Sequence, residues 1–390
     1  MKKTIIFLII LLLNTYVFAE DFKITHGPYL CNPTEDGISI VWTTNRPAVS
    51  WVEIAPDDGS HFYAKEREAH YITQAGRKLA TETLHHVRLE NLIPGQKYMY
   101  RVLSQEVTEW ESRNNIKFGK MADTDVYRGK PLGFKMIDKG AKELTFLVLN
   151  DIHSKASFMK EICKDVNFND IDLIFLNGDM SSYIESEEQL FKDYIDTLVT
   201  MGASRIPLVY VRGNHETRGR FSHQLINYFP TKNKEFYQSF KCGNVNFLML
   251  DCGEDKPDSD IAYLGLADYD AYREKQALWL KDIVETPEFK NASQRIVFSH
   301  MPLVGNQLDL WHGNLHLQKT ILPILNNANV QLTFSGHNHR YAYHPSKQGV
   351  ANFPTLINDN QSYVICKVND NTISVQIGGT GGVVRSFNID

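Results

Sequence analysis

Two residues that bind metals readily follow one apolar run. The run extends from Leu144 to Leu149 without a charge, and Asp151 and His153 come shortly after it. An uncharged run of this length is typical of a strand buried on both faces. In extended backbone, residues two positions apart point to the same side, so we expect Asp151 and His153 to face one ion together. Ligands of open α/β sheets also bind beyond the carboxyl ends of the strands.

Four further polar clusters follow predicted strands along the chain. A lone Gly-Asp is usually a turn, and a lone histidine is more often a hydrogen-bonded structural residue than a ligand. Taken together, however, clusters at the ends of successive strands predict one site, and the glycines suggest sharp backbone turns before the ligands. The four clusters are Gly178 and Asp179; Gly213, Asn214, His215 and Glu216; His300; and Gly336, His337 and His339.

The candidate ligands indicate the kind of metal. They provide three carboxylate or amide oxygens and four imidazoles, a mixture that suits two borderline transition-metal ions better than calcium or an all-oxygen site. Iron, manganese and zinc are the candidates, and the sequence does not choose among them. We therefore predict a metal-dependent enzyme. The seven candidate ligands are Asp151, His153, Asp179, Asn214, His300, His337 and His339.

The elements that must position these clusters belong to a predicted α/β domain, residues 142–390. Apolar strands are expected at 144–149, 171–176, 206–211, 295–299 and 330–335. The amphipathic segments Glu187 to Val199 and Tyr272 to Val284 are the clearest helices. Strands that alternate with helices predict sheets covered by helices.

A different pattern precedes this domain. Short alternating segments such as Gly37 to Thr44 and Val49 to Ile54 are separated by turns, and they predict an all-β sandwich over residues 20–122. No ligand cluster occurs there, so we expect a scaffold or docking role. Residues 123–141 lack periodicity and contain Gly129, Pro131 and Gly133, which predicts a linker between the domains.

The overall composition narrows the classes of protein. The chain has 390 residues, of which 43% are hydrophobic and 22% are charged, an ordinary globular composition with room for two domains. Its net charge of −5 argues against general binding to the nucleic-acid backbone. Its five cysteines form no Cys-x-x-Cys pair, so small buried thiols are expected, not structural zinc or a disulfide scaffold.

Residues 1–19 have the features of a secretory signal peptide. Lys2 and Lys3 precede an apolar stretch from Ile5 to Leu13, and a small-residue cleavage site ends at Ala19. The apolar core is too short to span a bilayer comfortably, and no later run reaches spanning length. We expect an exported protein, periplasmic or secreted, without a membrane span in the mature chain. The oligomeric state stays open.

The order of the five motifs resembles the calcineurin-like metallophosphoesterase superfamily over residues 144–345. In the first domain, the segment Leu92 to Val102 resembles the tyrosine-corner region of fibronectin type III domains, and Trp42 takes the place of their core tryptophan. This pair of domains resembles the architecture of purple acid phosphatases. The resemblance implies a fibronectin III-like all-β sandwich, followed by an α/β metallophosphoesterase domain with two packed mixed sheets flanked by helices.

The resemblance also implies residue roles. Asp151, His153 and His339 would bind one metal ion, Asn214, His300 and His337 would bind the other, and Asp179 would bridge both. A hydroxide held between the ions would attack the phosphorus of the ester, and His215 would protonate the departing oxygen. General acid catalysis of this kind is worth roughly 10²–10⁴-fold in rate. Glu216 is expected either to hydrogen-bond the His215 ring or to be a solvated loop carboxylate.

One departure separates this chain from purple acid phosphatases. They replace the first-motif histidine with a tyrosine ligand three residues after the bridging aspartate. Here His153 is present, the tyrosine position is Ser182, and Tyr183 comes one residue too late. We therefore expect a purple-acid-phosphatase relative with a generic metallophosphoesterase metal site.

Substrate contacts and substrate choice stay open. His312, in the polar stretch 309–316, is one candidate substrate-binding residue, and Arg340, Tyr183 and Glu216 beside the ligand motifs are others; surface loops explain these positions equally well. We expect hydrolysis of a small phosphate monoester. A phosphodiesterase or nucleotidase would use the same centre. A non-catalytic exported binding protein with a vestigial phosphoesterase domain is a third alternative, against which the complete ligand set argues.

Overall fold

The structure is a computed structural model that describes residues 20–305 and 310–389, so the predicted signal peptide lies outside the described residues. The strands are β1 (Ile24–Thr34), β2 (Gly37–Thr44), β3 (Ala48–Pro56), β4 (Ala69–Tyr71), β5 (Thr73–Gln74), β6 (Arg77–Lys78), β7 (Leu84–Leu89), β8 (Lys97–Ser112), β9 (Asn115–Asp123), β10 (Leu132–Lys135), β11 (Glu143–Leu149), β12 (Leu173–Asn177), β13 (Leu208–Val211), β14 (Gln238–Cys242), β15 (Val245–Leu250), β16 (Gln294–Ser299), β17 (Leu332–Ser335), β18 (Ala342–His344), β19 (Thr355–Ile357), β20 (Tyr363–Asn369), β21 (Ile373–Gly379) and β22 (Gly382–Ile389). The α-helices are α1 (Ala156–Ile162), α2 (Glu187–Leu190), α3 (Asp196–Leu198), α4 (Leu225–Tyr228), α5 (Tyr269–Ile283), α6 (Pro287–Lys290), α7 (His312–Thr320) and α8 (Leu322–Leu325).

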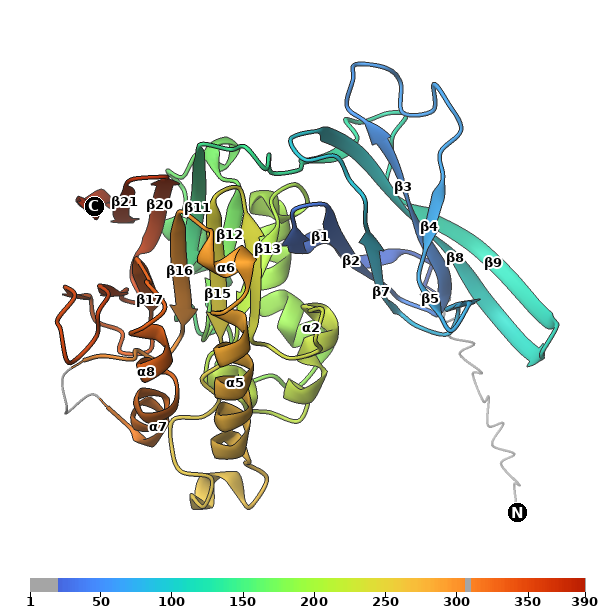
Figure 1. Cartoon of the computed structure of the whole chain (residues 1–390). Helices are drawn as coiled ribbons and strands as arrows, with labels where there is room; N and C mark the ends of the chain where they lie inside the picture. Colours follow the sequence, from blue (N-terminus) through green and yellow to red (C-terminus); the bar gives the residue numbers. More distant parts are fainter. Residues whose placement is uncertain (1–19, 306–309, 390) are drawn as a thin grey trace, which may run out of the picture.

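The N-terminal part is a β-sandwich, as predicted. One layer contains β1, β2 and β7, and the other has the strand order β10-β8-β3-β4 with β9 paired to β8. Trp42 is fully buried between the layers, where its Nε1 donates a hydrogen bond to Ser104 Oγ at 2.9 Å. The Ile93 backbone N–H donates to Tyr98 Oη at 2.9 Å, the contact expected of a tyrosine corner. The long β8–β9 hairpin extends away from the second domain (Figure 1).

The junction between the domains is tighter than the predicted linker implies. β10 lies inside the predicted linker and pairs antiparallel with β8, so the sandwich extends to Lys135. β1 pairs in parallel with β13, with Cys31 opposite Leu208. One nine-stranded sheet, in the order β22-β21-β20-β11-β12-β13-β1-β2-β7, therefore runs through both domains (Figure 1).

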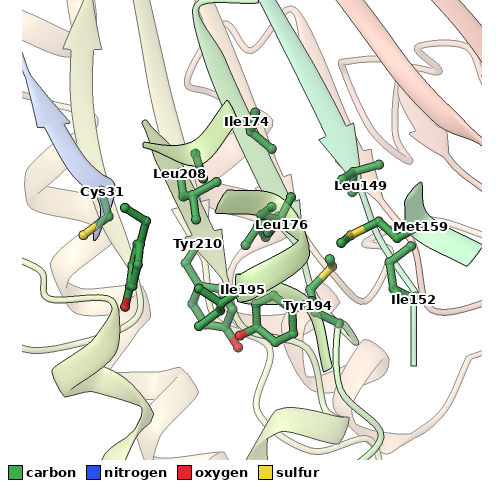
Figure 2. Close-up of a cluster of buried hydrophobic side chains, with 14 of the residues drawn as sticks. Cys31, Leu149, Ile152, Met159, Ile174, Leu176, Tyr194, Ile195, Leu208 and Tyr210 are labelled. Carbon is green, nitrogen blue, oxygen red and sulfur yellow. The ribbon is translucent and has the colours of Figure 1, made fainter. Parts of the chain in front are cut away.

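The alternation of side chains on β1 accounts for this continuity. Neighbouring residues of a strand point to opposite faces. Leu30 belongs to the core of the sandwich, whereas Tyr29 and Cys31 belong to the core of the second domain. Figure 2 shows Cys31 of β1 in the same apolar cluster as Leu208 and Tyr210 of β13. The two domains thus share one hydrophobic cluster.

The second domain has the predicted two mixed sheets with helices outside them. The six-stranded sheet has the order β14-β15-β16-β17-β19-β18. Phenylalanines from both sheets fill the space between them, and the rings of Phe175 and Phe298 stack at 4.0 Å. Helices α5, α7 and α8 pack on the outer face of the six-stranded sheet through Leu280, Leu317 and Leu325.

The other outer face is covered by α1 and by the helical stretch from α2 to Ala203. The helix predicted at Glu187 to Val199 is present and continues, partly in π-helical geometry, to Ala203. The helix predicted at Tyr272 to Val284 is α5. All five cysteines are buried and unpaired, as expected. Within the described part of the chain, none of the helices combines the length and the apolarity that a membrane crossing requires.

The strand directions explain where the polar clusters gather. β11, β12 and β13 are parallel neighbours in the nine-stranded sheet, and β16 and β17 are parallel neighbours in the six-stranded sheet. Parallel neighbours end on the same side, and the two sheets face each other, so the segments after these five strands converge at one end of the domain. Each of the five predicted motifs begins within two residues of one of these strand ends.

Candidate metal centre

The seven predicted ligands lie together at this end of the sheets. Asp151, His153 and His339 form one group whose ligand atoms all lie within 4.8 Å of one another, and Asp179, His300 and His337 form a second such group. In the first group, Asp151 Oδ1 is 3.2 Å from His339 Nε2, and His153 Nε2 is 2.9 Å from His339 Nε2.

The second group adjoins the first. Asp179 Oδ2 is 3.0 Å from His300 Nε2, and His300 Nε2 is 3.8 Å from Asp151 Oδ1. The amide ligand also lies here, because Asn214 Oδ1 is 3.0 Å from His337 Nδ1. This grouping agrees with the assignment of ligands to two ions that the resemblance implied. Asp179 is also close to His153, as a bridging residue must be.

The backbone brings these residues together differently from the way the sequence suggested. Asp151 and His153 are not extended: their φ angles are 54° and 49°. Asp179, His337 and His339 also have φ between 53° and 70°, the left-handed region that residues other than glycine rarely adopt. The alternation argument for Asp151 and His153 was therefore wrong in its geometry, although both residues do face the same point. Such strained residues cluster where function requires them.

The glycines serve mainly to leave space. Only Gly178 has the predicted left-handed turn, with φ of 84°. A Cβ atom on Gly213 would overlap Asp179 Oδ1, and one on Gly336 would overlap Asp151 Oδ2. These two glycines let the ligand loops approach each other closely.

Buried polar atoms at the centre fit a pair of cations. Asp151 and Asp179 are almost fully buried, and buried carboxylates require opposite charge nearby. Asp151 Oδ1 and His300 Nε2 are buried without a hydrogen-bond partner, although each points into the cluster. Burial lowers the pKa of His300, but Asp179 and Asp151 outweigh this and raise the pKa to about 10. The two carboxylates thus stabilise positive charge where a metal would bind.

Further contacts orient the ligands. His300 Nδ1 is 2.8 Å from the Asn177 carbonyl oxygen, which leaves Nε2 directed at the cluster. Asp151 Oδ2 accepts hydrogen bonds from Asn150 Nδ2 at 2.7 Å and from the His337 N–H at 2.9 Å, which leaves Oδ1 for a metal. Asn150 is in turn held by Asn358. Sequence reasoning missed this role of Asn150, although a polar amide at the end of a buried strand was a usable signal.

His215 lies beside the two ligand groups and is held there by separate contacts. Its Nδ1 is 2.9 Å from the Ser182 carbonyl oxygen, and its Nε2 is 4.0 Å from Asp179 Oδ2. A ring that donates from Nδ1 to a carbonyl presents Nε2 to the centre. The ligand atoms of His215, His153 and Asp179 all lie within 4.8 Å of one another, so His215 directly adjoins the candidate ligands.

Glu216 has neither of the predicted surroundings. It is fully buried, and its two oxygens accept hydrogen bonds at up to 3.0 Å from four backbone N–H groups, those of Asp179, Met180, Ser181 and Gly213. Burial and the charge of Asp179 raise the pKa of Glu216 to about 7, whereas the N–H groups favour its ionised form. Glu216 therefore ties together the two loops that carry Asp179 and Asn214.

The other candidate substrate-binding residues differ in placement. His312 begins α7, and its Nε2 lies 2.9 Å from both carboxylate oxygens of Asp270; among the described residues, no contact joins it to the ligand cluster. Tyr183 is 52% exposed, and Ser182 contacts the site through its backbone, which agrees with the absence of a tyrosine ligand in the motif. Arg340 is exposed next to His339. Their roles toward a substrate stay predictions.

Comparison with known proteins agrees with this architecture. The family model for calcineurin-like phosphoesterases matches residues 144–341, about half of the chain. The family model for the N-terminal domain of purple acid phosphatases matches residues 29–117. A purple acid phosphatase from yellow lupin seeds has the same fold, with a TM-score of 0.67 at 16% identity over 93% of this chain and 74% of that one.

Sequence relatives carry phosphatase names. The serine/threonine-protein phosphatase CPPED1 of mouse is 31% identical over 35% of this chain and 43% of its own length. Purple acid phosphatase 21 of Arabidopsis thaliana is 23% identical over 66% of this chain and 52% of its own length. The chain thus spans about half the length of these relatives. It belongs to the calcineurin-like phosphoesterase family, a family of hydrolases, and carries a purple acid phosphatase N-terminal domain before the phosphoesterase domain.

Proposed function

We propose that this chain is an exported phosphatase with a dinuclear transition-metal centre, and that it hydrolyses phosphate monoesters. The observation that carries the proposal is the convergence of seven side chains of ligand type, in which two buried atoms, Asp151 Oδ1 and His300 Nε2, make no hydrogen bond. The complete set argues against a vestigial, non-catalytic domain.

Each residue of the site has a proposed role in the reaction. Asp151, His153 and His339 would hold one ion, Asn214, His300 and His337 the other, and Asp179 both. A bound pair of ions supplies a nucleophilic water of lowered pKa and neutralises charge on the phosphoryl oxygens. His215, fixed by the Ser182 carbonyl, would donate a proton from Nε2 to the departing alcohol oxygen.

The choice of monoesters rests on the relatives. Acid phosphatase type 7 of mouse is 23% identical over 81% of this chain and 69% of its own length, and the plant relative is named a purple acid phosphatase. A diesterase or nucleotidase would share the metal centre and differ in the pocket. Substrate comparison is therefore part of the test.

The test combines metal analysis with a substrate panel. Elemental analysis of gently purified protein should find more than one transition-metal ion per chain, and 4-nitrophenyl phosphate should be hydrolysed with higher kcat/KM than bis(4-nitrophenyl) phosphate. Asp179→Asn should lower the content of both ions, because a neutral amide bridges cations poorly. Asp58→Asn, in an exposed loop of the sandwich, is the matched control. One ion or none after reconstitution would refute the dinuclear centre, and preference for the diester would refute the monoesterase.

Export requires a separate experiment. Cells that express the full chain should release a mature protein that begins near Glu20 into the periplasm or the medium, because the cleavage site is expected after Ala19. N-terminal sequencing of the fractionated protein measures this. An intact Met1 in a cytoplasmic fraction would refute export.

A further inference from the structure

A cleft of about 530 Å³ lies on the His215 side of the metal centre. A larger cavity of about 770 Å³ lies at the junction of the two domains, away from the ligands, and is lined by residues such as Lys97, Phe134 and Arg205. The smaller cleft is the one next to the chemistry. Its walls include Arg218, Glu254, Ala262, Tyr263, Leu266 and Tyr269.

Arg218 joins the cleft to the proposed proton donor. His215 to Thr217 form one 3-10 turn, in which side chains three residues apart lie over each other. Arg218 therefore lies against His215, with its Nη1 3.3 Å from His215 Nδ1 and 3.2 Å from His215 Nε2. Arg218, which lines the cleft, thus contacts the ring that would protonate the leaving oxygen.

Glu254 holds Arg218 in this position. The buried Glu254 carboxylate accepts hydrogen bonds from Arg218 Nε at 2.7 Å and from Arg218 Nη2 at 2.8 Å. Thr217 and Tyr263 donate to the same carboxylate. A guanidinium bound in this forked way is fixed in orientation, so it forms a rigid near wall of the cleft.

The charges that line the cleft are paired. Arg218 pairs with Glu254, and Arg212 pairs with Asp251 at 2.7 Å. Arg220 lies 3.3 Å from Glu185 at the surface. Each arginine of the lining therefore pairs with a carboxylate, and this pairing weakens the attraction of the lining for an anionic group.

Part of the cleft lining is a loop with apolar side chains, among them Leu266 and Ala267. It follows the short 3-10 turn Ile261–Tyr263, and Leu266 in it is 91% exposed. Ile261 and Leu264 in the same loop are 86% and 81% exposed. Aliphatic side chains gathered beside a cleft mark a surface that gains free energy when an apolar group covers it.

We propose that this cleft receives the alcohol portion of the phosphate ester and selects uncharged, apolar alcohols. This inference rests on the proposed function. In that reaction the bond between phosphorus and the alcohol oxygen breaks, water supplies the new oxygen of phosphate, and the alcohol oxygen takes a proton from His215. The alcohol must therefore leave past His215, which Arg218 of the cleft lining contacts.

A series of n-alkyl phosphates from methyl to hexyl tests the proposal. Complete removal of one methylene from water is worth about fourfold in binding, and a cleft that is open on one side should give about twofold for each methylene. From methyl to hexyl phosphate, kcat/KM should therefore rise about 30-fold. Phosphate release by the metal-loaded protein measures this. A 5-carboxypentyl phosphate of similar length should lose most of that gain, because its carboxylate resists leaving water.

Two variants test whether the dependence of kcat/KM on chain length arises in this cleft. Leu266→Ser should lower the ratio of hexyl to methyl kcat/KM by about threefold; since Leu266 is almost fully exposed, folding should not suffer. Ile93→Ser, at a 60% exposed position of the sandwich, should leave the ratio at its wild-type value.

The outcomes separate this inference from the proposed function. If methyl phosphate is hydrolysed but kcat/KM does not depend on the length of the alkyl chain, the proposal of a leaving-group cleft is wrong. The same holds if Leu266→Ser leaves that dependence intact. Neither result would contradict the phosphatase activity. Preference for the carboxylated ester would overturn the choice of apolar alcohols. Failure to hydrolyse any monoester would overturn both.

Discussion

Replacement of His215 by alanine tests the proposed proton transfer directly. The Nδ1 of His215 is held by the Ser182 carbonyl, so Nε2 is the atom that can deliver a proton to the substrate. An alkyl alkoxide is a poor leaving group and needs this proton, whereas 4-nitrophenolate leaves with little help. We therefore expect His215→Ala to harm the hydrolysis of methyl phosphate more than that of 4-nitrophenyl phosphate.

The expected size follows from what the ring contacts. The His215 side chain is 30% exposed and has one carbonyl partner and Arg218 beside it, so its loss should cost little stability. The effect should appear in turnover instead. General acid catalysis is worth about 10²–10⁴-fold, which corresponds to about 2.7–5.5 kcal/mol of transition-state stabilisation. The fall in kcat/KM for methyl phosphate should exceed that for 4-nitrophenyl phosphate by a factor in this range.

The assay needs kinetics and metal content on the same samples. kcat/KM for both substrates is measured in the wild type, in His215→Ala and in His61→Ala, a control at an exposed histidine of the sandwich. Elemental analysis accompanies each measurement, because His215 lies within ligand distance of His153 and Asp179. The variant should retain nearly all of its metal.

Three results would refute this reasoning in different ways. Equal losses on both substrates would mean that His215 binds the phosphoryl group and does not protonate the leaving oxygen. Loss of metal from His215→Ala would make it a ligand. Unchanged kinetics on methyl phosphate would place the proton donor elsewhere.

Three other variants address stability, pH and colour. Glu216→Ala leaves four buried backbone N–H groups without their acceptor, so urea unfolding should show a loss of about 2–5 kcal/mol relative to Glu66→Ala at an exposed position; equal stability would refute the role of Glu216. Burial lowers the pKa of His26, but Asp196 and Glu188 outweigh this and raise it. Since the folded-state pKa is raised, His26 contributes stability below its unfolded pKa of about 6.5 and loses it as pH rises through the folded value. His26→Gln should therefore destabilise the protein more at pH 5.5 than at pH 8.5, and a pH-independent difference would contradict this. Because His153 is present and Tyr183 is exposed, the iron-loaded protein should lack a tyrosinate-to-iron absorption band; a visible band that Tyr183→Phe abolishes would contradict this.

Most of the candidate site could be predicted because each of its motifs is a short local pattern, and such a pattern follows one predicted strand after another along the chain. Asp151, Asp179, Asn214, His300 and His337 each follow a strand, and parallel strands bring such ends together whatever the loops do. The loop conformations were not predictable in this way. The extended geometry assumed for Asp151 and His153 is replaced by left-handed turns, and the Asp151 carboxylate lies against Gly336, which belongs to a loop far away in the sequence.

Contacts between residues far apart in the sequence explain the remaining differences between the predictions and the structure. Glu216 was expected beside His215 or in solvent because adjacent residues were considered, whereas all but one of its partners come from the loop of Asp179, some 37 positions away. Glu254 and Arg218 were missed for the same reason. β10 was not predicted, because a strand of only four residues is too short to show a periodic pattern; its pairing with β8 becomes evident only in the structure. The strand pairing of β1 with β13 leaves no local pattern at all.

The shared sheet also determines what a shortened chain would do. β1 covers the hydrogen-bonding side of β13 that faces away from β12. A phosphoesterase domain produced without the sandwich would present that side of β13 as a bare strand edge, next to Leu208 and Tyr210, whose apolar neighbours Tyr29 and Cys31 would be gone. Bare edges of this kind pair with strands of other molecules and lead to aggregation. The first domain therefore covers a strand edge that the second one would otherwise expose, in addition to any part that it has in binding.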